Sequence, residues 1–307
     1  MLPAKAGHVN TSYGTAELPK VPRRLVMVGG GYISFEFAHV AARAGARVTI
    51  VNKGVLPLEP FDADLVDQVL PATRQLDITV LLSTSVRSIT KRSGQLVVAV
   101  EAENGQTHDI ETDAAVHGAG RVPDIDALDL QAGGVARNAK GIVVDEHLQS
   151  VSNAVVYAAG DAADSGGLPL TPVASLEGEI AVANLLQPKN RRVAHRGTPS
   201  VAFTTPALGA VVLLQSTARE RGLAFRTMSG DTSGWCSSRR LAAMPSGYKI
   251  LIEEKTDRVL GGHILGPGAE ELINIIALGI QLDLPASKLR EVVFAYPTAA
   301  SDLSSIL

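Results

Sequence analysis

The spacing of apolar and polar positions predicts a strand, a tight turn, a helix and a second strand near the start of the chain. Leu25–Val28 is a short apolar run, typical of a strand buried on both faces of a parallel sheet. Tyr32–Ala44 has apolar side chains at helical spacing, and Gly45 is expected to end that helix. Arg47–Val51 is rich in β-branched residues, which favour a strand. We therefore expect an α/β domain built around a β-α-β unit.

The next part of the chain predicts a helix and a series of strands. Phe61–Leu70 has the spacing of an amphipathic helix, and Pro71 is expected to end it because proline disrupts helix interiors. Five short strands are predicted after it: Thr79–Leu82, Val86–Ile89, Leu96–Val100, His108–Glu111 and Ala114–Gly118. Ala154–Asp161 reads AVVYAAGD and predicts a further buried strand ending in a turn. A helix is expected to follow up to Leu186, with Thr171 as its N-cap and Pro172 as its first residue.

From Arg196 onward, short strands followed by helices indicate a separate α+β domain. Its strands are predicted at Val201–Thr204, Tyr248–Glu253 and Val259–Leu265. The helix Glu270–Leu282 carries an apolar stripe of Leu272, Ile275, Ile276 and Ile280, which is either core or a dimer contact. The predicted segments are an irregular lead-in at 1–23, a first domain at 24–124, a second, partial domain at 125–195 and the α+β domain at 196–307.

Composition narrows the classes of protein. With 307 residues, 46% hydrophobic and 19% charged, the chain is globular and long enough for two or three compact units. A net charge of −3 and only 4% aromatic residues argue against nucleic acid and an anionic membrane surface as partners. No apolar run is long enough to span a membrane, so a cytoplasmic protein is predicted. Cys236 is the single cysteine, which excludes an internal disulfide and a multi-cysteine metal site, and no metal site is predicted.

The turn of the β-α-β unit has the pattern G-x-G-x-x-S, formed by Gly29, Gly31 and Ser34. Gly29 can adopt a positive φ, and Gly31 has no Cβ to keep a pyrophosphate from the helix N-terminus. Ser34 is small enough to let the helix pack close to its strand. Because the pattern lies inside a complete β-α-β unit, we interpret it as a dinucleotide site, with a purely structural turn as the alternative.

The end of the second strand bears on which dinucleotide is bound. An acidic residue there would bind the ribose hydroxyls of NAD, whereas this chain has Asn52 followed by Lys53. Lys53 can attract the 2′-phosphate of NADP, although Glu59 would oppose it and Lys53 can equally be a solvated loop residue. The sequence therefore favours NADP over NAD.

A second candidate site lies around residue 160. Gly160 allows a close approach, and the carboxylate of Asp161 can accept hydrogen bonds from sugar hydroxyls. The alternative is a buried strand followed by an ordinary turn aspartate. The helix that starts at Thr171 can stabilise negative charge on a bound ring system.

These landmarks, in this order, resemble the pyridine nucleotide-disulfide oxidoreductases, the flavoproteins that include glutathione reductase, dihydrolipoamide dehydrogenase and mercuric reductase. The likeness covers almost the whole chain. Its motifs are VGGGYISFE at 28–36, GAGRVPD at 118–124, VYAAGD at 156–161, LTPVA at 170–174, GGHILGPGAEELIN at 261–274 and FAYPT at 294–298.

The resemblance implies a role for each candidate residue. The nicotinamide dinucleotide would be held by Gly29, Gly31, Ser34, Asn52 and Lys53. The FAD would be bound by Gly160, Asp161, Thr171 and Ala174, and Gly120 is a further candidate cofactor-binding residue. The catalytic positions would be Tyr32, covering the nicotinamide side of the flavin, Glu36 beneath the flavin, and Tyr296 near the C-terminus. The fold implied is a Rossmann-like nucleotide-binding domain, part of an FAD-binding domain and a C-terminal α+β dimerisation domain, with a homodimer as the assembly.

The sequence departs from the family pattern in three ways. The family's first strand-turn-helix unit and its cysteine pair have no counterpart here, which suggests a truncated or split form that works with a separate N-terminal FAD-binding fragment or binds flavin weakly. Tyr296 replaces the catalytic histidine of the disulfide reductases, as in mercuric reductase. Ser301 stands where the acid that orients this histidine is expected, and Asp302 follows one position later. We expect an FAD-dependent NAD(P)H oxidoreductase without its own redox disulfide, and a non-catalytic NADP(H)-binding dimerising module as the alternative.

Overall fold

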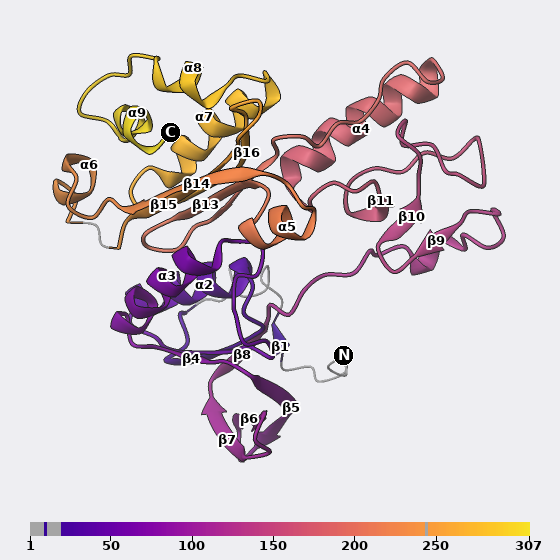
Figure 1. Cartoon of the computed structure of the whole chain (residues 1–307). Coiled ribbons are helices and arrows are strands. Elements are labelled where there is room, and N and C mark those ends of the chain that lie inside the picture. Colours follow the sequence, from indigo (N-terminus) through magenta and orange to yellow (C-terminus); the bar gives the residue numbers. More distant parts are fainter. Residues whose placement is uncertain (1–8, 11–19, 243–244) are drawn as a thin grey trace. The chain divides into compact units, whose positions relative to one another are not determined.

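The computed structural model describes residues 9–10, 20–242 and 245–307, and it divides the chain into two compact units. Unit 1 combines residues 1–120 with 199–307, and unit 2 comprises residues 121–198 (Figure 1). The predicted irregular lead-in at 1–23 lies mostly outside the described residues. Within it, β1 (Val9–Asn10) is a short strand paired in parallel with β8, so this part of the prediction is wrong.

The first sheet of unit 1 is parallel, with the order β1-β8-β2-β3-β4. Its other strands are β2 (Arg24–Val28), β3 (Arg47–Val51), β4 (Ile78–Leu81) and β8 (Ala114–His117). Helix α2 (Tyr32–Arg43) connects β2 to β3, which confirms the predicted β-α-β unit. The strands are apolar because the sheet is covered on both faces.

Helix α3 (Ala63–Gln75) starts at Asp62, whose side chain accepts a hydrogen bond from the Asp64 backbone N–H at 3.1 Å. The helix continues through Pro71, so the expectation that Pro71 ends it is wrong. Proline deprives the carbonyl of Asp67 of its helical partner, but both residues face solvent, where water can hydrate that carbonyl. The helix continues beyond Pro71 because packing of its buried face, which includes Leu65 and Val69, stabilises it on both sides of the proline.

The outer face of the parallel sheet is covered by an antiparallel meander. It consists of β5 (Thr84–Arg92), β6 (Gln95–Ala102) and β7 (Thr107–Thr112). Leu96, Val98 and Val100 of β6 pack on Val26 and Val51 of the sheet. Burial of this apolar row of β6 side chains against the sheet therefore holds the meander on this face.

The second sheet of unit 1 is antiparallel, with the order β12-β13-β16-β15-β14. Its strands are β12 (Pro199–Ala202), β13 (Leu208–Val212), β14 (Phe225–Asp231), β15 (Gly247–Glu253) and β16 (Val259–Leu265). The sequence pattern predicted β12, β15 and β16 but missed β13 and β14. The helices of this part are α5 (Gln215–Glu220), α6 (Cys236–Arg239), α7 (Ala269–Gln281), α8 (Ala286–Arg290) and α9 (Leu303–Ile306).

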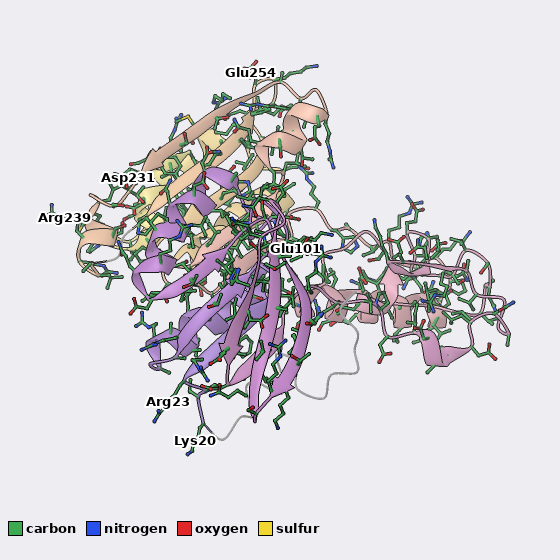
Figure 2. All side chains as sticks on the ribbon, turned by 90° about the horizontal axis from the view of Figure 1, so that it is seen from below. Lys20, Arg23, Glu101, Asp231, Arg239 and Glu254 are labelled. Carbon is green, nitrogen blue, oxygen red and sulfur yellow. The ribbon has the colours of Figure 1, made fainter. Side chains whose placement is uncertain are left out.

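Unit 1 is a stack of layers in which α2 and α3 lie between the two sheets (Figure 1). One core joins Met27 and Phe35 to Leu208 and Leu265 of the second sheet. A second core lies on the other face of that sheet, where the apolar stripe of α7, including Ile276, is buried. Charged side chains of both signs, such as Lys20, Arg239 and Glu254, project from the surface (Figure 2).

Unit 2 is built from short elements around α4 (Thr171–Leu186). Its small sheet has the order β11-β10-β9, formed by β9 (Arg137–Asn138), β10 (Gly141–Val143) and β11 (Ala163–Asp164). Two 3₁₀ helices, η1 (Asp126–Leu128) and η2 (Gly160–Ala162), complete it. Small apolar clusters form its core, one around Ile142 and one where Leu148 contacts Ile180 of α4.

Residues 154–161 do not form the predicted strand. Their one ladder contact is an isolated bridge between Tyr157 and Gln149, and η2 begins at Gly160. Val155 is 79% exposed. An apolar run becomes a strand only where neighbouring strands pair with it, and no described strand flanks these residues on both sides. Among the described helices, none is long and apolar enough to cross a membrane.

Candidate functional site

The glycine turn of unit 1 follows the carboxyl end of β2, where ligands bind in open α/β sheets. Gly29 has a φ of +103°, and its backbone N–H donates to the carbonyl of Val51 at 2.8 Å. A Cβ on Gly29 would lie 2.6 Å from both Ala119 Cα and Gly118 O. Glycine is therefore required at position 29 both by the backbone conformation and by the close approach of the segment after β8.

Gly31 is different, because the fold itself does not require a glycine there. Its φ of −79° is open to any residue, and an added Cβ would meet only Gly118 O, at 3.7 Å. Gly31 is also the N-cap of α2 and provides no side chain to cap the first backbone N–H groups. These donors have no partner within the helix, so the turn leaves an open set of N–H groups suited to an anion.

Ser34, in the third position of the glycine pattern, is fully buried. Its hydroxyl has no hydrogen-bond partner among the described residues. A Cβ on Gly118 would lie 2.2 Å from this Oγ, so the helix and the end of β8 approach closely here. A small side chain at Ser34 thus allows α2 to pack closely against the segment that follows β8.

Asn52 supports the turn from the end of β3. Its Oδ1 accepts a hydrogen bond from the Gly30 backbone N–H at 3.1 Å, and its Nδ2 donates to the carbonyls of Gly54 and Leu56 at 3.0 and 3.2 Å. The amide of Asn52 is therefore used to fix the glycine turn. Lys53, next along the chain, is exposed.

Tyr32 and Glu36 lie on the first turns of α2 and are half-buried. Tyr32 packs against the core between the sheets. Glu36 Oε1 accepts a hydrogen bond from the Phe203 backbone N–H at 2.8 Å. Burial raises the pKa of Glu36 above its ordinary value, and the bond from Phe203 only partly offsets this effect.

His39, which sequence reasoning did not identify, is buried one turn further along α2. Its Nδ1 accepts from the Thr205 backbone N–H at 3.0 Å, and its Nε2 lies 3.0 Å from Thr73 Oγ1. Since Thr73 donates its own proton to the Val69 carbonyl, the Nε2 of His39 is the donor and the ring is neutral. Burial, with a smaller effect of Arg43, lowers the pKa of His39 to about 4.

In unit 2, Gly160 and Asp161 form the start of η2, and Gly160 has a φ of +61°. The carboxylate of Asp161 pairs with Arg121 at 2.9 Å. Arg121 also donates to the Pro169 carbonyl at 2.7 Å, immediately before α4. Sequence reasoning noted the GAGRVPD motif but assigned no role to Arg121, which connects the aspartate to the start of the helix.

The start of α4 differs by one residue from the prediction. Leu170 is the N-cap and Thr171 the first helical residue, and no side chain caps this end, so the expectation that Thr171 caps the helix is wrong. A Cβ on Gly160 would lie 2.9 Å from the Ala174 Cβ, which brings Gly160, Asp161, Thr171 and Ala174 together within unit 2. Gly120, the last residue of unit 1, is exposed, with a φ of +104°.

Tyr296 is 77% exposed in the C-terminal part of unit 1. A hydrogen bond with Cys236 raises the pKa of Tyr296 above its ordinary value. The fold places the exposed thiol of Cys236 beside this tyrosine. Asp302 accepts a hydrogen bond from Ser237, and burial raises the pKa of this carboxyl. This aspartate therefore anchors α6 to the C-terminal segment.

Family models match nearly the full length of the chain. Residues 4–178 match the pyridine nucleotide-disulphide oxidoreductase model, and residues 198–305 match the dimerisation domain of the same family. The chain belongs to the pyridine nucleotide-disulphide oxidoreductases. This assignment confirms the family and the α/β fold class predicted from the sequence.

Individual relatives show how much of a family protein this chain represents. An uncharacterized 19.7 kDa protein in a mercuric resistance operon of Staphylococcus aureus is 38% identical over 180 residues, which cover 59% of this chain and all of that protein. Mercuric reductase of Bacillus cereus is 29% identical over 95% of this chain, but the match spans only 46% of the reductase. The structure of the flavoprotein disulfide reductase RclA from Escherichia coli superposes with a TM-score of 0.87 at 28% identity, covering 98% of this chain and 67% of RclA.

Proposed function

We propose that this chain binds a reduced nicotinamide dinucleotide through the glycine turn of unit 1 and takes part in hydride transfer to a flavin. The observation that carries this proposal is Gly31. Neither its backbone conformation nor its neighbours require a glycine, so the missing side chain is best explained by a ligand that approaches the backbone. The uncapped N–H groups of α2 and the exposed Lys53 support a phosphate-bearing ligand, with NADP preferred over NAD.

Unit 2 fits the part of FAD that its residues would hold. Asp161 presents a half-exposed carboxylate for hydroxyl groups, and the uncapped N-terminus of α4 at Thr171 offers backbone N–H groups to a polar ring edge. Arg121 would neutralise part of the negative charge of the Asp161 carboxylate, with which it forms an ion pair. The chemistry that a bound flavin supplies is acceptance of a hydride from the reduced nicotinamide.

The electron acceptor proposed is not an internal disulfide, because Cys236 is the only cysteine of the sequence. The raised pKa of Tyr296 keeps its phenol protonated near neutral pH. Such a group donates a hydrogen bond and does not shuttle protons as a histidine does. The role assigned to Tyr296 is therefore to hold an acceptor and not to catalyse thiol-disulfide exchange.

We also propose that unit 2 functions with a separate FAD-binding fragment and that the chain forms a homodimer through its dimerisation domain. The chain spans about half to two thirds of the length of the reductases it matches. Helix α4 leaves Val182, Leu185 and Leu186 between 57% and 82% exposed, and Val155 is also exposed. Exposed apolar side chains grouped on one helix are normally covered, so they favour an additional protein segment over solvent.

The alternative is a non-catalytic dimerising module that binds NADP(H) through the same glycine turn. Calorimetric titration with NADPH and NADH tests the binding that both functions share, and NADPH oxidation with added FAD and an artificial acceptor separates them. Gly31→Ala should weaken NADPH binding at least about tenfold, or about 1.4 kcal/mol, and should lower stability by no more than about 1 kcal/mol because alanine is a poorer N-cap than glycine. The matched control is Gly178→Ala on α4, where an added Cβ meets no atom of the described residues within 4 Å.

Lys53→Glu should reduce the ratio of NADPH to NADH affinity by repelling the 2′-phosphate. If the chain binds neither nucleotide, or if Gly31→Ala binds as tightly as the wild type, the proposed site is wrong. Binding without turnover would support the module.

A further inference from the structure

Glu177, on the second turn of α4, is a fully buried carboxylate within unit 2. Its Oε2 accepts a hydrogen bond from the Gly160 backbone N–H at 2.7 Å, and its Oε1 accepts one from Ser165 Oγ at 2.6 Å. The Ser165 hydroxyl in turn accepts from the Gly167 backbone N–H at 3.1 Å. One carboxylate therefore fixes both ends of the loop 160–167, directly at Gly160 and through Ser165 at Gly167.

The loop packs so closely on this carboxylate that a side chain at Gly167 would not fit. An added Cβ would lie 2.8 Å from Glu177 Oε1, 2.9 Å from Val173 Cγ1 and 2.7 Å from His195 Cε1. His195 completes the cluster, with its buried Nε2 3.2 Å from Glu177 Oε1 and in no hydrogen bond of good geometry among the described residues. His195 belongs to the segment that leads out of unit 2.

A buried carboxylate is costly unless hydrogen bonds and an opposite charge compensate it, and an apolar residue of similar size is often no less stabilising. Its presence here therefore needs a reason other than stability. The loop that Glu177 fixes carries Asp161, and the helix that carries Glu177 begins at Thr171. These are the two features through which unit 2 is proposed to hold a flavin.

We infer that Glu177, supported by His195, is a positioning residue that fixes the Gly160–Asp161 turn against the first turn of α4 and so sets the geometry in which unit 2 receives a hydroxyl-bearing cofactor. This inference rests on the proposed flavin site for the identity of the ligand. The positioning role itself is based on the hydrogen bonds that Glu177 accepts from Gly160 and Ser165, which do not depend on the identity of the ligand.

Hydrogen exchange at the Gly160 amide in the full chain tests the inference without any ligand. Glu177→Leu removes both acceptors at similar volume, so exchange at Gly160 should accelerate about tenfold or more. Glu177→Gln retains one carbonyl acceptor and should give an intermediate rate. Glu179→Gln, on the exposed face of the same helix, is the matched control and should leave the rate unchanged.

The second measurement is the affinity for added FAD, followed by flavin absorbance and fluorescence. The affinity for FAD should be lowest in Glu177→Leu and intermediate in Glu177→Gln, which retains one carbonyl acceptor. His195→Phe should also weaken FAD binding. Unchanged Gly160 exchange in Glu177→Leu would overturn the inference. If exchange accelerates but the wild type binds no FAD, the positioning of the turn is supported and the flavin proposal fails.

Discussion

The buried imidazole of His39 predicts a specific loss of stability in mild acid. Burial lowers its pKa from 6.5 to about 4 in the folded protein. The folded state therefore binds fewer protons than the unfolded state, so the stabilisation is complete above pH 6.5 and is lost as the pH falls toward 4. The full difference corresponds to about 3 kcal/mol, of which about 2 kcal/mol is lost between pH 7.5 and pH 5.

Urea unfolding followed by the fluorescence of Trp235 measures this effect, since Trp235 packs against the core beside α7 in unit 1. His39→Gln does not titrate, so its stability at pH 7.5 and pH 5 should differ by about 2 kcal/mol less than in the wild type. His108→Gln, an exposed histidine on β7, is the matched control and should keep the wild-type difference. Glu36, whose raised pKa acts in the opposite direction, is present in all three proteins. A wild-type pH response in His39→Gln would refute the assignment of a neutral, buried imidazole.

Two further substitutions test the close packing at the glycine turn and the buried ion pair of unit 1. Gly29→Ala combines a positive φ with a Cβ only 2.6 Å from Ala119 Cα, so it should lose about 2 kcal/mol more stability than Gly45→Ala, whose positive φ occurs in open space. Lys249 pairs with the buried Asp62 at 2.8 Å, and Lys249→Met should cost about 3 kcal/mol because it leaves that carboxylate unpaired. The exposed Lys288→Met should change stability by less than about 0.5 kcal/mol. Urea unfolding at pH 7.5 measures both, and equal losses within either pair would contradict the packing described.

Local signals in the sequence predicted the central β-α-β unit, because β2, α2 and β3 each carry their own pattern of apolar residues. The predictions that were wrong share one cause, which is that tertiary surroundings outweighed local sequence propensity. Pro71 remains helical because the carbonyl that loses its hydrogen-bond donor to the proline faces solvent. The apolar run around Val155 forms no strand because no described strands lie on both sides of it to pair with it. Propensity describes a segment alone, while both outcomes were decided by what surrounds it.

The sequence identified candidate site residues where glycines or charged residues form a local motif. It did not identify the residues that hold these candidates in place. His39 and Glu177 are separated by 166 and 17 residues from the backbone N–H groups that they bind. Neither belongs to a recognised pattern. A histidine or glutamate on a helix usually faces solvent or completes a core, so only the folded structure could identify these acceptors.

The two candidate binding regions share one physical arrangement. In unit 1, the side chain of Asn52 accepts the N–H of Gly30, and in unit 2 the side chain of Glu177 accepts the N–H of Gly160. Each acceptor comes from another segment and immobilises the residue immediately before the group proposed to meet a ligand, Gly31 in one unit and Asp161 in the other. Fixing these turns before a ligand arrives reduces the entropy lost on binding. Flexible glycine-containing turns can in this way serve as defined binding surfaces, and the specificity of each is then set by the next residues along the chain.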